Sequence, residues 1–337
     1  MDNLFHLQRW GMVMATMRAA QFRRYEPPDV LEIATVPIPV PKAGEVLVRV
    51  GATTVNGGEL LFRTGKLRAL SGSRFPKGIG IDFAGEVAAL GDGVTGVAIG
   101  EAVWGVIDER RFIRTKASIG SVADYIAVDA GRLGPSPAGL APVEAAALLA
   151  GGVVSIIALR DKARLAAGER ILIRGGTGGV GSVTVQLAHA FGAHVTALVG
   201  PRNLEFVRGL GADEALDYTT TTPAQLGRYN VIVDIVGADM NAYRRHLTAR
   251  GRMVAVTLDP PLRALGTVLA STIFGSQRIR FFSGDPKRTL LTDLARYVED
   301  GTLRPVIDSI YALDEIAAAH RSAESRGGRG KRVIKVR

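Results

Sequence analysis

Three glycines in the middle of the chain have the spacing of a phosphate-binding turn. Gly176, Gly178 and Gly181 form G-x-G-x-x-G, directly after the apolar run RILIRG and before the helix-like run GSVTVQLAHAFG. The first glycine permits a tight turn, the second lets backbone approach a pyrophosphate, and the third lets the helix pack closely. The amino end of that helix favours an anion through its free N–H groups and its dipole. We therefore expect a dinucleotide at the loop, made of Gly176, Thr177, Gly178, Gly179, Val180 and Gly181.

The next apolar run, HVTALVG, indicates which dinucleotide this is. A site for NAD usually carries an acid at the end of this second strand, whereas a site for NADP lacks the acid and supplies a cation. Here the run ends in Gly200, Pro201, Arg202 and Asn203, with an arginine where the acid is missing. Arg202 would also suit an ordinary solvated helix start. The missing acid, however, also favours NADP(H). We therefore predict NADP(H), with Gly200, Arg202 and Asn203 among its contacts.

Strand-like and helix-like runs alternate around this loop and must position it. Helical patterns cover 141–163, 181–192 and 203–211, and strand patterns cover 170–175, 194–200, 230–237 and 251–258. Strands that alternate with helices favour an α/β fold with a parallel, doubly wound sheet. From Arg18 to Val128, by contrast, short β-like runs are separated by Gly and Pro turns, which is typical of a compact β-rich unit. A helix, a further mixed segment and the strand KRVIKVR follow residue 285.

Composition narrows the classes of protein. The 337 residues, 47% of them hydrophobic, suffice for two domains, and we see no long charge-free apolar span. The first sixteen residues lack the pattern of a secretory signal, so we interpret them as an extension. The absence of cysteine excludes disulfides, thiolate zinc sites and a cysteine nucleophile, and suits a reducing cytoplasm. The net charge of +10 is scattered among acids, which disfavours nucleic acid as a partner.

Several longer motifs resemble one family. They are VLVRVGATTVNGGELLFRTG, GIDFAGEVAALGDGVTGVAIGEAVWG, GSVADYIAV, ERILIRGGTGGVGSVTVQLAHAFGAHV, RGLGADEALDY and EDGTLRPVIDSIYALDEIAAAH. From about Met17 to its end, the chain resembles the medium-chain dehydrogenase/reductase superfamily, in its zinc-independent, quinone oxidoreductase-like branch. The resemblance implies a Rossmann NADP-binding domain, 141–284, inserted in a β-rich GroES-like catalytic domain. That domain would span 17–140 and be completed by 285–337, after an extension at 1–16. The resemblance also implies an active site in the cleft between the domains, and a homodimer.

Zinc-dependent relatives use Cys and His around a Gly-His-Glu motif. The equivalent stretch here reads GIGIDFAG, and cysteine is absent. None of the five histidines stands at ligand spacing from a carboxylate, so we predict no metal. Without such a Lewis acid, hydride delivery to an already activated acceptor is more plausible than oxidation of a simple alcohol.

The resemblance also implies individual site residues. Asn56, in TTVNGGELL, matches the asparagine that relatives carry near the nicotinamide, and we expect it to orient cofactor or substrate as the catalytic residue. Where relatives often have tyrosine or aspartate, this chain reads GGELLF, so Glu59, a water or a 2'-hydroxyl of the cofactor would have to donate the proton. Val154 replaces a threonine that often lies against the nicotinamide. The remaining expected cofactor contacts are Tyr218 near the adenosine phosphate, Val236 and Gly237 beneath adenine and ribose, Thr257 and Leu258, and Phe281, Phe282 and Ser283 over the nicotinamide.

The function that these features favour is reduction, by NADPH, of a quinone or an α,β-unsaturated carbonyl. Two alternatives stay open. One is a pathway-specific enoyl or ketone reductase of a polyketide-like intermediate. Two basic clusters would suit an anionic or carrier-linked substrate if they line the cleft: Arg63, Lys66, Arg68 and Arg74, and Arg110, Arg111, Arg114 and Lys116. The other is a non-enzymatic NADPH- or RNA-binding protein. We expect a cytoplasmic protein with a small-molecule substrate and with no nucleic-acid or membrane partner.

Overall fold

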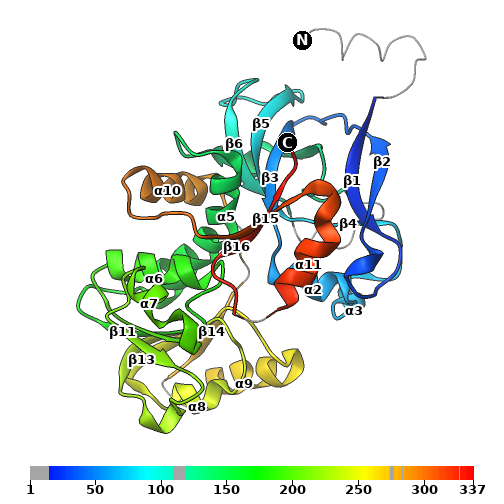
Figure 1. Ribbon diagram of the computed structural model, residues 1–337. Coiled ribbons are helices and arrows are strands. Elements are labelled where there is room, and N and C mark those ends of the chain that lie inside the picture. Colours follow the sequence, from blue (N-terminus) through cyan, green and yellow to red (C-terminus); the bar gives the residue numbers. More distant parts are fainter. Residues whose placement is uncertain (1–14, 109–118, 274–276, 283, 285, 326) are drawn as a thin grey trace.

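The described residues of the chain form three β-sheets with helices packed around them (Figure 1). The computed structural model describes residues 15–108, 119–273, 277–282, 284, 286–325 and 327–337. The predicted extension at 1–16 therefore falls almost entirely outside the described residues, apart from its last two positions. The β-rich part lies in the upper half of the view and the large parallel sheet in the lower half, with a long helix between them.

The six-stranded sheet is parallel throughout and runs in the order β11-β10-β9-β12-β13-β14. Its strands are β9 (Arg170–Arg174), β10 (His194–Val199), β11 (Glu214–Asp217), β12 (Tyr229–Asp234), β13 (Leu247–Ala255) and β14 (Ile279–Phe281). The order proceeds outward from β9 in both directions, as in a Rossmann domain, so the predicted doubly wound sheet is confirmed. Helices α6 (Gly181–Ala190), α7 (Leu204–Arg208), α8 (Met240–Arg244) and α9 (Pro261–Ile273) lie between these strands along the chain.

The β-rich part consists of the other two sheets. The small one has the order β2-β1-β4, and the seven-stranded one has the order β15-β16-β3-β5-β6-β8, with β7 also paired to β3. The strands are β1 (Thr16–Phe22), β2 (Glu32–Pro37), β3 (Glu45–Thr54), β4 (Lys77–Gly78), β5 (Asp82–Leu90), β6 (Ala102–Val106), β7 (Tyr125–Asp129), β8 (Leu133–Pro135), β15 (Ile307–Ala312) and β16 (Lys331–Lys335). Because β15 and β16 join this sheet, the end of the chain returns to the β-rich part, as expected.

Among the described residues, the helices that accompany the β-rich part are α2 (Gly57–Arg63), α3 (Arg68–Ser71), α10 (Arg288–Glu299) and α11 (Ile316–Glu324). The α11 helix packs on β16 and α2, while α10 packs on β8 and on the long helix α5. The domain boundaries that we predict, at residues 140 and 285, fall between β8 and α5 and between β14 and α10. We retain these boundaries as a proposal.

The long helix at the centre of Figure 1 is α5 (Pro142–Ile156), which continues as a π-helical segment, Ile157–Ala163. It begins within the predicted helical range 141–163, and in its first turn Glu144 Oε2 accepts the N–H of Ala141 at 3.0 Å. By length and composition alone the helix would suit a membrane span, but 72% of its most apolar window is buried inside the protein. It packs on β3, β5 and α6, so it is a core helix shared by both parts of the molecule.

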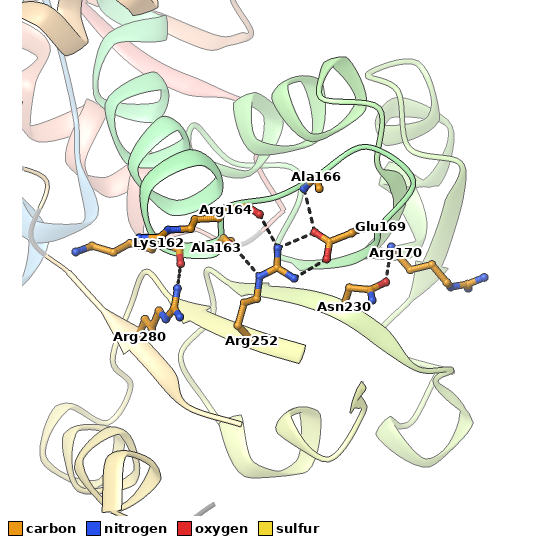
Figure 2. Close-up of polar contacts among 9 residues, drawn as sticks. All are labelled: Lys162, Ala163, Arg164, Ala166, Glu169, Arg170, Asn230, Arg252 and Arg280. Carbon is orange, nitrogen blue, oxygen red and sulfur yellow. Dashed lines mark hydrogen bonds and ion pairs between the residues drawn. The ribbon is translucent and has the colours of Figure 1, made fainter. Parts of the chain in front are cut away.

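Arginines from the parallel sheet cap the carboxyl end of this helix (Figure 2). The chain leaves the helix through Arg164, whose φ of 50° is left-handed. Arg252, on β13, donates to the carbonyls of Ala163 and Arg164 and binds both carboxylate oxygens of Glu169, each at 2.6 Å. Arg280, on β14, donates to a further carbonyl at the helix end. These contacts satisfy carbonyls that a helix end leaves without intrahelical partners.

Candidate functional site

The predicted cofactor residues follow the strands of the parallel sheet one after another. The glycine loop follows β9, Gly200 to Asn203 follow β10, Tyr218 follows β11, Val236 and Gly237 follow β12, Thr257 and Leu258 follow β13, and Phe281 and Phe282 lie at the end of β14. Since all six strands are parallel, the structure brings these residues to one edge of the sheet. Ser283 lies outside the described residues. The individual contacts of these residues with a cofactor stay predictions.

The glycine loop fits a pyrophosphate. A Cβ atom at Gly181 would lie 2.0 Å from the carbonyl oxygen of Gly175, so α6 can begin this close to the turn only with glycine there. A Cβ at Gly178 would meet no atom within 4 Å, which leaves the loop open at the glycine where backbone is expected to approach the phosphates. The ten-residue helix α6 starts at Gly181 and presents its amino end to this opening.

The end of β10 carries the features expected around the adenosine phosphate. A Cβ at Gly200 would lie 3.4 Å from Cε1 of Tyr218, so the half-exposed tyrosine ring lies against that glycine. Arg202 and Asn203 form a short 3-10 turn directly after it. This places one arginine and no acid at residues 200–203, as the sequence indicates.

Arg329 adds a second cation at the end of β10. Its Nε donates to Oδ1 of Asn203 at 2.7 Å and its Nη2 to the carbonyl of Arg202 at 2.5 Å. Its guanidinium also lies 5.3 Å from the ring centre of Phe206. Sequence reasoning missed this residue, because it stands in the simple segment RGGRG at 326–330 and nothing local connects it to β10.

The predicted nicotinamide end is lined by α5 and by the segment after β14. A Cβ at Gly284 would lie 3.5 Å from Cγ2 of Val154. Val154, which stands where relatives often have a threonine, therefore faces the segment after β14. Phe281 is 45% exposed, while Phe282 is half-buried against the main core. The two phenylalanines therefore differ, and Phe281 has the more accessible ring.

Asn56 lies at the amino end of α2, where its side chain joins a buried polar cluster. Its Nδ2 donates to Oε1 of Glu59 at 2.9 Å and to Oδ2 of Asp82 at 3.2 Å. Its Oδ1 accepts a hydrogen bond from Nζ of Lys331, the first residue of β16. Glu59, Asp82 and Lys331 are each at most 5% exposed. The amide of Asn56 is thus fixed on both sides by charged groups.

Asp82 fixes the end of β3 next to Asn56. Its Oδ1 accepts the N–H of Thr54 at 3.0 Å, and its Oδ2 accepts the hydroxyl of Thr54 at 2.5 Å. The hydroxyl of Thr53 donates to the carbonyl of Asp82 at 2.7 Å. All three residues are fully buried. Asp82 therefore shapes the end of the strand.

Lys331 connects the glycine loop with the Asn56 cluster. The N–H of Gly330 donates to the carbonyl of Thr177 at 2.7 Å, which attaches the start of β16 to the loop. A Cβ at Gly179 would lie 2.5 Å from Cδ of Lys331, so the lysine stem crosses directly over that glycine. Burial lowers the pKa of Lys331, against the opposing effect of Asp82 and Glu59. In the sequence, Lys331 reads only as one of several cations in the last strand.

The described side chains do not fit a zinc site. The chain has no cysteine, and among the described residues no group of three or more His, Asp and Glu could hold a metal ion. His194 lies 3.6 Å from Asp213 and 3.4 Å from Glu214, but at the amino end of β10, opposite the glycine loop. His320 is buried, and burial, together with nearby Arg63, lowers its pKa to about 3. We therefore derive no catalytic step through a metal.

One member of the first basic cluster of the sequence lies inside the protein. Arg63 is fully buried, donates to the carbonyl of Glu26 at 2.6 Å and forms an ion pair with Glu324. It therefore supports the packing of α2 and does not line a cleft. The second cluster, Arg110, Arg111, Arg114 and Lys116, lies outside the described residues.

Comparison with known proteins gives consistent matches over most of the chain. Residues 42–138 match the family described as alcohol dehydrogenase GroES-like domain, and residues 210–334 match the family described as zinc-binding dehydrogenase. The chloroplast envelope quinone oxidoreductase homolog of Arabidopsis thaliana is 30% identical over 330 residues, which cover 94% of this chain and 98% of the relative.

Two further matches extend this similarity. The chloroplastic NADPH-dependent alkenal/one oxidoreductase of Arabidopsis thaliana is 31% identical, over 94% of this chain and 79% of the relative. The solved structure of the quinone oxidoreductase from Coxiella burnetii has a TM-score of 0.86 and 28% identity, and the match covers 96% of this chain and 100% of that one.

Proposed function

Because the chain belongs to the medium-chain dehydrogenase/reductase superfamily, in its quinone oxidoreductase-like branch, we propose that it is a zinc-independent, NADPH-dependent reductase of quinones or α,β-unsaturated carbonyl compounds. The names of its relatives, a quinone oxidoreductase homolog and an alkenal/one oxidoreductase, support this class of small-molecule acceptor. The alternative of a non-enzymatic binding protein has less support, because the relatives are named as oxidoreductases.

One observation carries the proposal. The N–H of Gly330 donates to the carbonyl of Thr177 in the glycine loop at 2.7 Å, and Nζ of Lys331 donates to Oδ1 of Asn56. These two neighbouring residues therefore join the open glycine loop to the buried Asn56 cluster. The loop would hold the pyrophosphate of the cofactor. The polar groups of the Asn56 cluster lie at the other end of the Lys331 side chain, which crosses the loop at Gly179. A binding loop that adjoins a group of buried proton donors and acceptors suits a hydride-transfer site.

The features at the end of β10 support NADP(H) over NAD(H). The 2'-phosphate that distinguishes the two would lie where the acid of an NAD site usually stands. Arg202 and Arg329 supply two guanidinium groups there, and guanidinium binds phosphate through strong charge-assisted hydrogen bonds. Tyr218, exposed beside Gly200, adds an aromatic surface for the same end of the cofactor.

The reacting end of the site selects the kind of acceptor. When bound, the cofactor supplies a hydride, and the protein must orient the acceptor and stabilise the negative charge that develops on it. The described residues offer polar groups for this purpose but no set of zinc ligands. We therefore expect acceptors in which conjugation spreads the charge, such as quinones and enones, and slow reaction with saturated ketones.

A matched panel of acceptors tests the proposal. Oxidation of bound NADPH is followed by stopped-flow absorbance with a benzoquinone, a 2-alkenal, an enone and the saturated ketone of the same carbon skeleton. We expect rapid oxidation with the conjugated acceptors and little with the saturated ketone. Rapid reaction with the saturated ketone alone would contradict the proposal. Tight NADPH binding without turnover of any acceptor would instead favour a binding protein.

The homodimer that we expect has one structural support. The strand β14 is the last strand in the order of the parallel sheet, so one of its edges faces away from the sheet. On the neighbouring helix α9, Leu265 and Leu269 are 42% and 56% exposed. We propose that a second copy covers this edge. Sedimentation should then give a dimer, and Leu269→Glu should shift it towards monomer.

The cytoplasmic location stays a prediction from composition. The two Arabidopsis relatives are named as chloroplastic or chloroplast envelope proteins, so their names do not support a cytoplasmic location. A small-molecule substrate without a nucleic-acid or membrane partner also stays our proposal, in keeping with the names of those relatives.

A further inference from the structure

Lys331 is a buried cation. The contacts proposed above for binding the cofactor assign it no role. It is 5% exposed, and its Nζ donates to the hydroxyl of Thr54 at 3.1 Å and to Oδ1 of Asn56. Burial of an ammonium is costly unless other groups compensate for it. Asp82 and Glu59 supply compensating negative charge, so Lys331 belongs to a polar cluster and is not merely packed as a strand residue.

The position of Lys331 adjoins both halves of the candidate site. Its stem crosses Gly179 in the loop that would bind pyrophosphate, and its ammonium reaches Asn56 on the β-rich part. The preceding residue, Gly330, is itself hydrogen-bonded to Thr177 of the same loop. Lys331 is thus held between the cofactor loop and the residue that we predict at the reacting end.

Burial makes Lys331 a stronger acid than an exposed lysine, although two acids face it. Asp82 and Glu59 face it with negative charge, and its neighbour Arg332 adds positive charge. Burial has the largest effect and lowers the pKa of Lys331, while Asp82 and Glu59 act to raise it. A lowered pKa is the usual tuning of a lysine that exchanges protons during catalysis.

The proposed reaction needs a proton as well as a hydride. Addition of hydride to the β-carbon of an enone moves the π electrons onto the carbonyl oxygen and leaves an enolate. The hydrogen-bond partners of the Asn56 side chain in the described chain are Thr54, Glu59, Asp82 and Lys331. Of these, Lys331 alone is a cation that can give up a proton and become neutral.

We propose that Lys331 is the proton donor of the reduction, an inference that rests on the proposed reductase function. An Nζ–H bond of Lys331 breaks, the proton bonds to the enolate or to the quinone-derived oxyanion, and Lys331 is left as a neutral amine. The amine then takes a proton from water before the next turnover. Asn56, which accepts a hydrogen bond from the ammonium, acts as a positioning residue for Lys331.

Three lysine variants test this role. Lys331→Met keeps the stem but removes the proton, and Lys331→Arg keeps the charge but does not release a proton at neutral pH. We expect both to lower kcat with an enone by about 100-fold or more, the usual contribution of a general acid. The dissociation constant for NADPH, measured by fluorescence titration, should change by less than about threefold. Lys335→Met, at an exposed lysine of the same strand, is the control and should match the parent.

The pH profile separates Lys331 from Glu59. In the parent, kcat should fall at alkaline pH as Lys331 loses its proton. Glu59→Gln removes a negative charge that raises the pKa of Lys331, so this alkaline limb should move to lower pH while turnover continues. If Glu59 were the donor, Glu59→Gln would instead abolish turnover.

A direct titration gives a readout apart from activity. The chain has eight lysines, so its ¹³Cε-lysine spectrum is simple, and the signal absent from Lys331→Met identifies Lys331. We expect this signal to titrate at lower pH than those of the exposed lysines. If Lys331→Met does not fold, the Lys331→Arg variant identifies the same signal.

The outcomes that contradict the inference are distinct from failure of the proposed function. A parent protein that reduces no acceptor overturns both. An active parent whose Lys331→Arg variant keeps full kcat overturns the proton-donor role alone, and so does a Lys331 signal that titrates with the exposed lysines. Loss of NADPH binding with kcat unchanged at saturation would make Lys331 a cofactor contact.

Discussion

Arg174 and Asp234 lie side by side at the carboxyl ends of β9 and β12, with 2.6 Å between Nη1 and Oδ2. They are 7% and 0% exposed, and they stand where the strand order of the parallel sheet reverses. The other carboxylate oxygen of Asp234 accepts the N–H groups of Val236 and Gly237, each at 3.0 Å. This ion pair therefore holds the loop that we predict beneath the adenine and ribose.

Removal of Arg174 alone should be more damaging than removal of both charges. Burial raises the pKa of Asp234 and Arg174 opposes that effect, so Arg174→Met leaves a buried carboxylate without its cation. We expect Arg174→Met to lower the free energy of unfolding by about 3 to 5 kcal/mol. The double variant Arg174→Met/Asp234→Asn keeps the oxygen that accepts the two N–H groups and should be more stable than Arg174→Met. Urea unfolding at neutral pH measures both, and a double variant less stable than the single one would contradict this account.

The two arginines at the end of β10 should confer preference for NADPH. Arg202→Ala and Arg329→Ala should each weaken NADPH binding by about 1.5 to 3 kcal/mol, or roughly 10- to 150-fold, because each loses a charge-assisted contact with phosphate. Binding of NADH, which has no 2'-phosphate, should change little. Arg208→Ala, at an arginine on α7 that forms an ion pair with Glu205, is the control. Calorimetric titration with both nucleotides decides the matter, and equal losses for NADH and NADPH would refute the assignment.

The parts of the site that could be predicted from the sequence are local in the chain. Gly176, Gly178 and Gly181 follow a strand and open a helix, so their spacing alone indicates the turn and the sheet around it. Arg329 and Lys331 could not be found in this way, because their partners Asn203 and Asn56 lie 126 and 275 residues away. Only the return of β16 to the β-rich part brings these distant residues together.

Asn56 shows a different limit of sequence reasoning. The resemblance places it near the nicotinamide, but the sequence does not reveal what its amide contacts. In the structure both sides of the amide are engaged by charged groups, Glu59 and Asp82 on one side and Lys331 on the other. A cluster of this kind depends on three strands and a helix, and no short motif encodes it.

The variant Asn56→Ala should lower kcat more than it weakens NADPH binding. Loss of the amide removes a partner of Lys331 and leaves two carboxylates without its N–H groups, whereas the glycine loop and the arginines at β10 remain. We expect kcat with a quinone to fall by about 10-fold or more, since hydrogen-bond networks that orient reacting groups commonly contribute this much. Steady-state kinetics and NADPH titration measure the two effects, and a variant as fast as the parent would remove Asn56 from the mechanism.

Chelation should leave activity unchanged. The chain has no thiolate ligand, and the described residues offer no cluster of three metal-binding side chains. Exhaustive dialysis against a strong chelator should therefore preserve kcat for a conjugated acceptor, and elemental analysis should find no stoichiometric zinc. One zinc per chain whose removal abolishes turnover would overturn the assignment to the zinc-independent branch.

The contact between Arg252 and Glu169, at the end of the long helix, should make stability depend on pH (Figure 2). The hydrogen bonds from Arg252 hold the pKa of Glu169 below its usual range, although partial burial acts against them. A carboxyl whose pKa is lower in the folded state stabilises the protein fully above its unfolded pKa, which is about 4.3 for glutamate. That stabilisation disappears as the pH falls through the folded pKa.

Comparison of the parent with Glu169→Gln isolates this effect, because glutamine keeps the size of the side chain and leaves Arg252 its two carbonyl partners. At pH 7 the parent should be more stable by about 1 to 2 kcal/mol, the contribution of a partly exposed, charge-assisted pair. The difference should shrink below about pH 4.3 and vanish once Glu169 is protonated in the folded state as well. Thermal unfolding at a series of pH values measures it. A difference that stays constant from pH 7 to pH 3 would show that the charge of Glu169 contributes nothing and that its contacts act through shape alone.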